Sequence, residues 1–337
     1  MFENRVDIIS VDFTDKCNLC CRHCFNYSGT RKVDSSLLSD SEILSFMDDI
    51  CELDISSCCV CGGEPMLRKD LIYSAVNIVK NNSSSTMNMV SNGLLIGKKE
   101  AKSLKDSKID NVQISLDGFE EAHNWLRMNN NAFQYAVDAI DNLICAGCEV
   151  GVACTPNKKN LADIPQLIEF LHDKGIRDFR MQPIMRMGRA KDIQDFYPTN
   201  QDYVHLVELL EKYRRIYKNM IVEWGDPTEH LGALSKGKWL KSISINSYGD
   251  IMISPYIPIS FGNIRKHSLQ EYLDEGLADV VKNDVLKNIF SLATDALTLD
   301  VSSKINLPEL YGGNIYSIDL FESDINYKLT ELAERLN

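Results

Sequence analysis

The sequence predicts an α/β fold built on a parallel sheet. Short apolar runs alternate six times with longer runs in which apolar residues recur at helical spacing. Strands that alternate with helices pair in parallel, because each helix carries the chain back to the edge where the next strand begins. A length of 337 residues suffices for one large α/β domain with an appendage, or for two domains.

The expected elements follow one another in a regular order. Strands are predicted at residues 8–14, 56–61, 86–91, 112–116, 150–155 and 178–184. Helices are predicted between them at residues 41–53, 71–80, 98–106, 132–146 and 164–174. Ser39 or Asp40 is the expected cap of the first helix.

After Arg189 the pattern changes, and we expect a second region over residues 191–337 beside a first region over residues 1–190. A helix at 201–217, a hairpin at 242–254 and a short helix at 269–275 are predicted there. A terminal amphipathic helix is indicated by Phe321, Ile325, Leu329, Leu332 and Leu336. We expect it to cover one end of the fold rather than to bind a partner.

Alternation within the strands predicts which side chains face a central cavity. In the fourth strand Val112, Ile114 and Leu116 share the apolar face, so the opposite face is expected to line the cavity with Gln113, Ser115 and Asp117. The same rule turns Cys59 and Cys61 inward and Cys58 and Val60 outward.

Composition excludes several classes of protein. A net charge of −12 disfavours a nucleic-acid groove. The chain has no run of about 18 uninterrupted apolar residues, so we expect no membrane span, and its start lacks a secretory signal. All 11 cysteines, an odd number, lie between Cys17 and Cys154, which favours a reducing cytoplasm over a disulfide framework.

The most informative motif is CxxxCxxC, formed by Cys17, Cys21 and Cys24. Three thiolates on one short loop can hold three irons of a [4Fe–4S] cluster and leave the fourth iron open. Together with Cys20 they offer four ligands to a structural zinc ion instead. Zinc sites usually pair a CxxC with a distant second pair, so the spacing favours the cluster.

Three further motifs stand where predicted strands end: Gly62-Gly63-Glu64-Pro65, Ser91-Asn92-Gly93 and Ser115-Leu116-Asp117-Gly118. With the cysteine triplet, Asn160 and Gly188-Arg189-Ala190, they resemble the radical S-adenosylmethionine (radical SAM) superfamily from Val6 to Arg189. The Tyr248-Gly249-Asp250 hairpin and the Gly262-Asn263-Ile264 turn resemble the C-terminal SPASM or twitch domain of its peptide and cofactor maturases.

The resemblance implies a partial (β/α)6 TIM-like barrel with a small C-terminal α+β extension of the SPASM or twitch type. It also implies two cofactors, one [4Fe–4S] cluster on Cys17, Cys21 and Cys24, and S-adenosylmethionine (SAM). The reduced cluster would cleave SAM to methionine and a 5′-deoxyadenosyl radical, which abstracts hydrogen from a substrate. Cys20 is then a spare thiol rather than a ligand.

By the same resemblance, His23 would touch the adenine of SAM, and the turn of Gly62, Gly63, Glu64 and Pro65 would meet its methionine amino group. Candidates for contacts with the ribose or carboxylate are Ser91, Asn92, Ser115 and Asp117. Arg127 would pair with the carboxylate, unless it is a solvated surface arginine. We expect no catalytic role for His123.

One departure from the family pattern bears on the reaction. Residues 155–337 contain no cysteine, so we expect no cysteine-held auxiliary cluster there. Cys145 and Cys148 are interpreted as structural thiols. A redox-neutral outcome is then favoured, in which Cys61, or else Cys59, returns a hydrogen atom to the substrate radical. The alternative is that both are small residues of a tightly packed strand.

Three functions remain open at this point. The first is hydrogen abstraction from a peptide of the ribosomally made, post-translationally modified (RiPP) type, possibly ending in epimerisation or rearrangement. It would need an electron donor such as flavodoxin or ferredoxin and, because only 16 residues precede Cys17, a separate leader-binding protein or recognition by the C-terminal region. The second is the same chemistry on a sugar, nucleoside or cofactor precursor. The third is a non-catalytic iron–sulfur or zinc protein.

Overall fold

The computed structural model describes residues 6–30, 36–225, 229–238, 240–292 and 315–336. Eleven strands form one continuous sheet in this part of the chain. They are β1 (Ile8–Asp12), β2 (Ser57–Cys61), β3 (Thr86–Ser91), β4 (Asn111–Ser115), β5 (Val150–Cys154), β6 (Asp178–Met181), β7 (Ile221–Trp224), β8 (Ser242–Ile245), β9 (Asp250–Met252), β10 (Ile259–Asn263) and β11 (Tyr316–Ser317).

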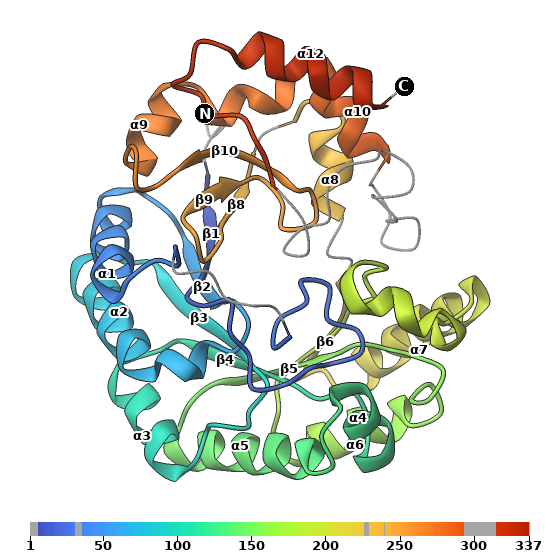
Figure 1. Cartoon of the computed structure of the whole chain (residues 1–337). Helices are drawn as coiled ribbons and strands as arrows, with labels where there is room; N and C mark the ends of the chain where they lie inside the picture. Colours follow the sequence, from blue (N-terminus) through green and yellow to red (C-terminus); the bar gives the residue numbers. More distant parts are fainter. Residues whose placement is uncertain (1–5, 31–35, 226–228, 239, 293–314, 337) are drawn as a thin grey trace.

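The sheet runs in sequence order from β1 to β7, and every neighbouring pair in that series is parallel. It curves into an open barrel with helices on its outer side (Figure 1). The predicted α/β fold with a partial TIM-like barrel is therefore confirmed. The predicted strands at 86–91 and 150–155 differ from the observed ones by one residue at most.

Helices cover the outer face of the barrel. They are α1 (Asp40–Asp49), α2 (Lys69–Asn82), α3 (Lys98–Asp106), α4 (Glu120–Arg127), α5 (Ala132–Ala146), α6 (Ile164–Asp173) and α7 (Asn200–Ile216). Four 3₁₀ turns complete the described elements, at Ile50–Glu52, Pro65–Arg68, Gly188–Phe196 and Leu277–Lys282. Each of the longer helices buries one apolar stripe against the sheet, as amphipathic helices do.

Helix starts follow the expected local chemistry. Ser39, rather than Asp40, caps α1: its side chain accepts from the backbone N–H of Glu42, whose carboxylate accepts from the backbone N–H of Ser39. The same reciprocal box opens α7 at Thr199. Such caps satisfy the first backbone donors of a helix, which otherwise lack partners.

Sequence reasoning missed α4 and β7, two elements that bear on the site. The α4 helix spans only eight residues and ends at Met128 in a left-handed conformation, so it offers little periodicity to detect. The β7 strand has four residues, one of them the exposed Ile221, and it lies at the edge of the sheet. Short elements such as these give weak patterns.

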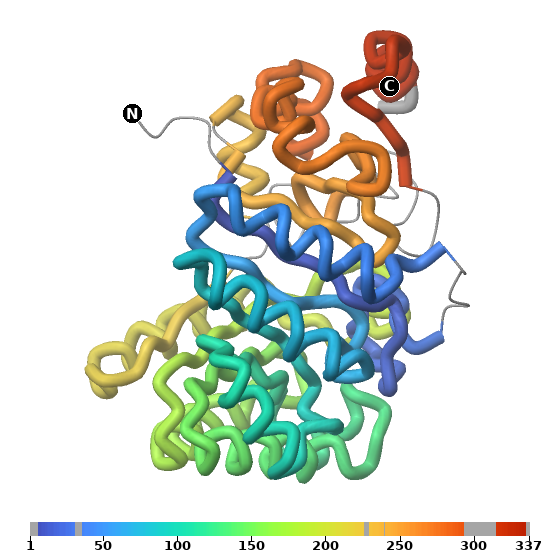
Figure 2. Tube along the Cα trace, turned by 90° about the vertical axis from the view of Figure 1, so that its left-hand side faces the viewer, coloured from blue at the N-terminus to red at the C-terminus, as the bar shows by residue number. Residues whose placement is uncertain are grey.

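The C-terminal strands extend the barrel instead of forming a separate sheet. The β8 strand pairs in parallel with the free edge of β1, and β9 and β10 add antiparallel strands beyond it. The predicted hairpin at 242–254 is thus formed by β8 and β9. Helix α8 (Glu229–Leu234) precedes β8, whereas α9 (Leu269–Asp274) and α10 (Asp284–Leu292) follow β10 and precede α12 (Ile325–Leu336). Figure 2 shows α9, α10 and α12 at one end of the molecule.

Two details of this region correct the sequence prediction. Gly262 and Asn263 belong to β10 rather than to a turn, and the α-carbon of Gly262 faces the ring of Tyr272, which a Cβ would approach to 2.2 Å. Phe321 lies before the terminal helix, where its ring stacks on His267 at a centroid distance of 3.8 Å. The side chain of Leu336 lies outside the described residues.

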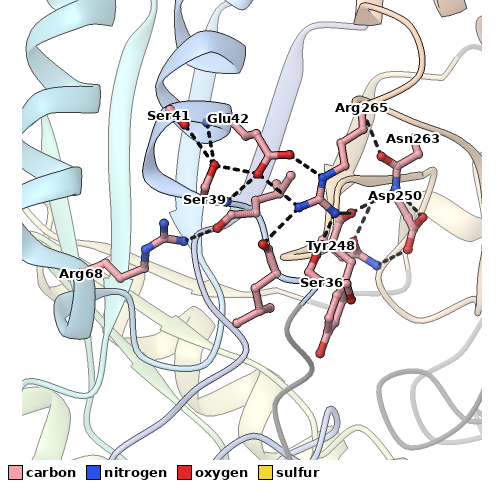
Figure 3. Close-up of polar contacts among 12 residues, drawn as sticks. Ser36, Ser39, Ser41, Glu42, Arg68, Tyr248, Asp250, Asn263 and Arg265 are labelled. Atoms are coloured by element: carbon pink, nitrogen blue, oxygen red, sulfur yellow. Dashed lines mark hydrogen bonds and ion pairs between the residues drawn. The ribbon is translucent and has the colours of Figure 1, made fainter.

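A polar cluster, which we call the Arg265 network, ties the C-terminal strands to α1 (Figure 3). The Nε atom of Arg265 donates to Glu42 Oε1 at 2.5 Å, and its Nη atoms donate to the carbonyl oxygens of Ser36 and Leu37. Arg265 and Glu42 are about one third exposed. The network therefore joins two segments that are 223 residues apart in the chain.

The hairpin also contacts the segment that carries the cysteine motif. The Tyr248 hydroxyl donates to Asp15 Oδ2 at 2.9 Å, and Asp15 is buried. No helix in the described ranges is both long and apolar enough to cross a membrane.

Candidate active site

A cavity of about 490 Å³ opens at the carboxyl ends of the barrel strands. In parallel α/β folds this edge is where ligands bind. Most of the predicted site residues line it, namely Cys17, Cys21, His23, Cys24, Cys59, Cys61, Gly62, Gly63, Glu64, Ser91, Asn92, Ser115 and Arg127. The C-terminal region contributes Ser244, Pro255 and Tyr256 to the same wall.

The three cysteines of the motif lie together on one loop at the cavity, and Cys20 does not line it. The Cys20 thiol lies 3.5 Å from the carbonyl oxygen of Gly29 instead. Burial, the largest influence, raises the pKa of Cys17 to about 12. Burial also raises the pKa of Cys21, against the lowering effect of Arg127.

Helix α4 and the segment at Arg189 hold this loop from two sides. The backbone N–H of Arg22 donates to Leu126 O at 2.8 Å, and its Nε donates to Trp125 O at 3.0 Å. Arg189 donates from Nε to Cys21 O at 2.8 Å and from Nη2 to Ser28 O at 2.7 Å. The loop that carries the thiols is therefore hydrogen-bonded both to the end of α4 and to Arg189.

Gly188 brings the Arg189 segment close enough for these bonds. Its φ is +55°, and a Cβ there would lie 2.4 Å from the carbonyl oxygens of both Cys24 and Phe25. The backbone N–H of Arg189 donates to Cys24 O at 3.0 Å. Only glycine has both the conformation and the space that this approach needs.

The glycine pair at the end of β2 approaches the same loop. A Cβ on Gly62 would lie 2.4 Å from Thr14 O, and one on Gly63 would lie 2.1 Å from Lys16 O. The backbone N–H of Gly63 donates to Thr14 O at 2.7 Å. These two glycines therefore let the end of β2 approach the backbone of the cysteine loop closely.

Glu64 is buried and held by groups from β3. Its carboxylate accepts from the Ser91 hydroxyl at 2.7 Å and from the backbone N–H of Asn92 at 2.8 Å. Burial raises its pKa, while these hydrogen bonds oppose the rise. Ser91 and Asn92 thus position Glu64. Pro65 lies outside the cavity lining and begins the 3₁₀ turn that follows, with Glu64 as its cap.

A second buried cluster, the Asp117 network, lies under the cysteine loop. Arg127 donates from Nε to Asp117 Oδ2 at 2.7 Å, and its Nη1 lies 3.9 Å from Cys21 Sγ. Asp117 Oδ1 accepts from the backbone N–H of Thr155, and Asn160 donates to the backbone carbonyl of Asp117. Burial alone would raise the pKa of Asp117, but Arg127 and His123 outweigh it and hold it well below its usual range.

This network corrects two expectations. Arg127 is only 8% exposed, so the alternative of a solvated surface arginine is wrong. Asp117 does not line the cavity as alternation predicted, because β4 ends at Ser115 and the strand periodicity no longer applies two residues later. His123 belongs to the network, since its Nδ1 accepts from the backbone N–H of Asp117 at 2.9 Å.

His23 offers a direct indication of a ligand. Its Nδ1 is buried and has no hydrogen-bond partner among the described residues, although the side chain lines the cavity. Burial lowers its pKa to about 3, with a further lowering effect of Arg127, so the ring is neutral. A buried polar atom without a partner usually meets a ligand or water, so the site fits a group with a polar edge beside the cysteine loop.

The inward cysteines of β2 form a contact of their own. Cys59 and Cys61 both line the cavity, and Cys61 Sγ donates to Cys59 Sγ at 3.5 Å. Cys58 and Val60 lie in the core on the opposite face, as alternation predicted. The hydrogen bond that Cys61 donates to Cys59, and burial, raise the pKa of Cys61 well above its usual range.

The zinc alternative finds no support in the arrangement of these side chains. Within the described ranges, no three histidine, cysteine, aspartate or glutamate side chains converge as a single metal ion requires.

The sequence analysis did not identify several residues that position the cysteine loop. Asp15 and Arg22 belong to no motif that the sequence analysis used, and Tyr248 was noticed only as part of a hairpin. Only their contacts reveal that they hold the loop. Arg189 and Asn160 were noticed as parts of motifs, but nothing in their spacing specified what they would bind.

Comparison with known proteins agrees with this geometry. The model of the Radical SAM superfamily matches residues 11–171. The Fe-coproporphyrin III synthase of Methanosarcina barkeri is 28% identical over 230 residues, which are 68% of this chain and 56% of that protein. The mycofactocin maturase MftC of Mycobacterium tuberculosis is 27% identical over 308 residues, or 85% of this chain and 73% of that protein. The chain therefore spans little more than half of the first relative.

Solved structures share the fold. Streptococcus suis SuiB bound to precursor peptide SuiA superposes with a TM-score of 0.66 at 14% identity, covering 83% of this chain and 67% of SuiB. Native anSMEcpe with bound AdoMet gives a TM-score of 0.63 at 17% identity and covers 98% of both chains. The motifs and the cavity agree with the family match, and residues 11–171 of this chain form a Radical SAM domain.

Proposed function

We propose that this chain abstracts a hydrogen atom from a peptide of the RiPP type and ends the reaction without net oxidation, as in an epimerisation or rearrangement. The observation that carries the proposal is the size and lining of the cavity. The superfamily uses a [4Fe–4S] cluster and SAM. When bound, these groups supply one-electron cleavage of a sulfonium and a radical that abstracts hydrogen.

The residues of the chain hold these groups in the proposal. Cys17, Cys21 and Cys24 are the cluster ligands, and Arg127 lies beside Cys21 as a charged donor. Hydrogen bonds to cluster sulfurs are one of the means by which proteins tune a cluster. The hydrogen bonds from Arg22 and Arg189 keep the loop in place while the cluster is assembled on its cysteines.

SAM would lie between the loop and the strand ends. We assign His23 to its adenine, the turn of Gly62, Gly63 and Glu64 to its amino group, and Ser115 and Arg127 to its carboxylate or ribose. Ser91 and Asn92 act through Glu64, which they hold at 2.7 and 2.8 Å. Asp117 acts through Arg127, and Pro65 shapes the turn.

Cavity size favours a peptide over a large ring system. Sites for drug-sized ligands occupy roughly 300–1,000 Å³, and this cavity of about 490 Å³ has to accept SAM as well. The remaining space suits one amino-acid side chain better than a tetrapyrrole. Its lining includes the polar side chains of Ser10, Gln113, Thr155 and Gln182. A peptide can insert one residue and leave the rest of its chain outside.

The inward thiols favour a reaction that returns hydrogen. A hydrogen-atom donor must keep its S–H bond, and the raised pKa of Cys61 keeps this thiol protonated at neutral pH. Residues 155–337 contain no cysteine that could hold an auxiliary cluster. We therefore assign hydrogen return to Cys61, with Cys59 beside it.

The partners are part of the proposal. An electron donor of the flavodoxin or ferredoxin class would reduce the cluster in a reducing cytoplasm. Recognition of a leader peptide would fall to a separate protein or to residues 191–337, which we regard as the second region of the chain. A small-molecule substrate remains the second candidate, because one relative is an Fe-coproporphyrin III synthase.

The test begins with anaerobic reconstitution of the full chain with iron and sulfide, followed by reduction with dithionite. Mass spectrometry then measures 5′-deoxyadenosine in the presence of precursor peptides encoded beside the gene, or of a panel of sugars, nucleosides and porphyrins. We expect peptide-dependent 5′-deoxyadenosine and a peptide product of unchanged mass.

The controls separate the candidate functions. Cys17→Ala removes a proposed ligand and should abolish 5′-deoxyadenosine, whereas Cys20→Ala should leave it unchanged. Stimulation by a metabolite alone would favour the second candidate. A formed cluster that releases no 5′-deoxyadenosine with any compound would favour a non-catalytic iron–sulfur protein.

A further inference from the structure

The β2 strand places two thiols in contact inside the cavity, and a single hydrogen donor needs only one of them. Cys59 and Cys61 are two residues apart on one face of the strand, with their sulfur atoms 3.5 Å apart. The register of β1 against β2 sets Asp12 opposite Cys61 and Ser10 opposite Cys59. All four residues line the cavity.

We propose that Cys59 and Cys61 act as a relay, in which Cys61 returns the hydrogen atom to the substrate and Cys59 then shares the resulting sulfur radical. The inference rests on the proposed function, because it needs a substrate radical to start from. It extends that function by assigning what happens to the enzyme after the substrate has been released.

The steps balance as follows. The substrate radical takes H• from the Cys61 S–H bond, which leaves a substrate C–H bond and a thiyl radical on Cys61. This radical forms a three-electron bond with the Cys59 sulfur, whose proton passes to the Asp12 carboxylate. One electron from a donor of the flavodoxin or ferredoxin class then breaks the bond between the two sulfur atoms and leaves two thiolates. The proton on Asp12 and a second proton from water convert these thiolates into two thiols.

The spacing of the pair favours this sharing over a permanent disulfide. Residues two apart on a strand have Cα atoms about 6.4–6.8 Å apart, at the upper end of the range that a disulfide spans. A full S–S bond would therefore strain β2. A contact of 3.5 Å between the sulfurs already permits electron sharing with only a small movement of side chains.

Position along the strand assigns the two roles. Cys61 is the last residue of β2 and stands directly before the glycine turn that follows the strand. Cys61 is also nearer than Cys59 to the carboxyl end of β2, where the cysteine loop approaches Gly62 and Gly63. Cys61 is thus the hydrogen-atom donor, and Cys59 is its partner.

The first experiment tests the contact and needs neither cofactor nor substrate. The purified full chain is treated with iodoacetamide, and residue-resolved mass spectrometry follows alkylation of Cys61. Loss of the bond to Cys59 lowers the pKa of Cys61, so Cys59→Ala should accelerate its alkylation about threefold for each pKa unit. Cys58→Ala, which changes the opposite face of β2, should leave the rate unchanged. Equal Cys61 rates in wild type and Cys59→Ala would overturn the pairing.

The second experiment counts turnovers with a peptide that the wild type converts, in deuterated water. Wild type should make many equivalents of deuterium-labelled product. Cys61→Ala should form 5′-deoxyadenosine but no labelled product. Cys59→Ala should stop after about one equivalent, because its isolated thiyl radical cannot be shared and is not efficiently reduced. Cys58→Ala should turn over like the wild type.

The outcomes are distinguishable from failure of the proposed function. If the wild type releases no 5′-deoxyadenosine with any peptide, the proposed function fails, and the alkylation experiment still decides whether the thiols are paired. Sustained turnover by Cys59→Ala overturns the relay. Loss of all labelled product in Cys59→Ala also overturns it, since Cys59 would then be needed before hydrogen return.

Discussion

The Asp117 network and the Arg265 network are both built around an arginine–carboxylate pair, yet they differ in burial and in what they hold. Asp117 is fully buried and Arg127 nearly so, and the pair lies beneath a cysteine of the proposed cluster. Arg265 and Glu42 are each about one third exposed and join the C-terminal strands to α1 (Figure 3).

The difference shows that the energetic importance of an arginine–carboxylate pair depends on its burial. A buried charge that loses its partner stays out of water, so its removal is costly. An exposed charge regains water when its partner is lost, and exposed pairs contribute about 0–1 kcal/mol. The inner network should therefore tolerate almost no change, and the outer network should tolerate most.

The largest expected effect follows from Asp117→Asn. The substitution leaves Arg127 charged and buried without its carboxylate, which should lower the free energy of unfolding by about 3–5 kcal/mol. We also expect iron uptake to fall, because Arg127 no longer lies fixed beside Cys21. Urea unfolding and iron analysis measure both effects. Asp141→Asn, which breaks the half-exposed pair with Lys174, should cost about 0–1 kcal/mol; a similar loss in both variants would contradict the comparison.

Gly188→Ala should have the next largest effect. It forces a side chain into a left-handed conformation, which costs about 1–2 kcal/mol, and it pushes a Cβ against the carbonyl oxygens of Cys24 and Phe25. Gly175→Ala is the matched control, since φ there is +88° with nothing within 4 Å. Iron content after reconstitution should drop for Gly188→Ala alone. Equal iron loss in both variants would assign the effect to backbone strain.

Tyr248→Phe probes the contact between the hairpin of β8 and β9 and the segment that carries the cysteine motif. It removes the hydrogen bond to the buried Asp15, and we expect a loss of about 0.5–1.5 kcal/mol in the free energy of unfolding. Tyr135→Phe changes a tyrosine that is 45% exposed and should have no measurable effect. Denaturant unfolding of the three chains measures this. A neutral Tyr248→Phe would mean that the hairpin does not brace the cysteine loop.

The smallest effect should come from Glu42→Gln, with a characteristic pH dependence. The hydrogen bond from Arg265, followed by those from Ser39, lowers the pKa of Glu42 from its ordinary 4.5 to about 2. The folded state therefore favours the ionised form, and this stabilisation is complete above about pH 4.5 and disappears as the pH falls toward 2.

At neutral pH we expect a loss of about 0–1 kcal/mol in this variant. The difference in unfolding free energy between Glu42→Gln and wild type should shrink below pH 4.5, as urea unfolding at pH 6 and pH 3.5 can measure. A difference that grows on acidification would contradict the assigned direction of the pKa.

Much of the barrel and the site was predictable from local patterns. Alternation of strands and helices specified the parallel sheet from β1 to β6, and the side-chain period of two placed Cys59 and Cys61 in the cavity. The motifs lie at strand ends, and parallel strands bring all such ends to one edge. Thirteen of the fifteen predicted site residues consequently line one cavity, and Pro65 and Asp117 are the two that do not.

The sequence by itself determined the kind of fold, the cysteine loop and the edge where the site forms, because these depend on spacing along the chain and on strand period. Only the tertiary structure decided that Glu64 is held by Ser91 and Asn92, that Arg127 lies buried on Asp117, and that β8 continues the sheet beside β1. These contacts join residues between 10 and 234 positions apart. Their partners are selected by burial and hydrogen-bond geometry in three dimensions, which no local pattern of residues records.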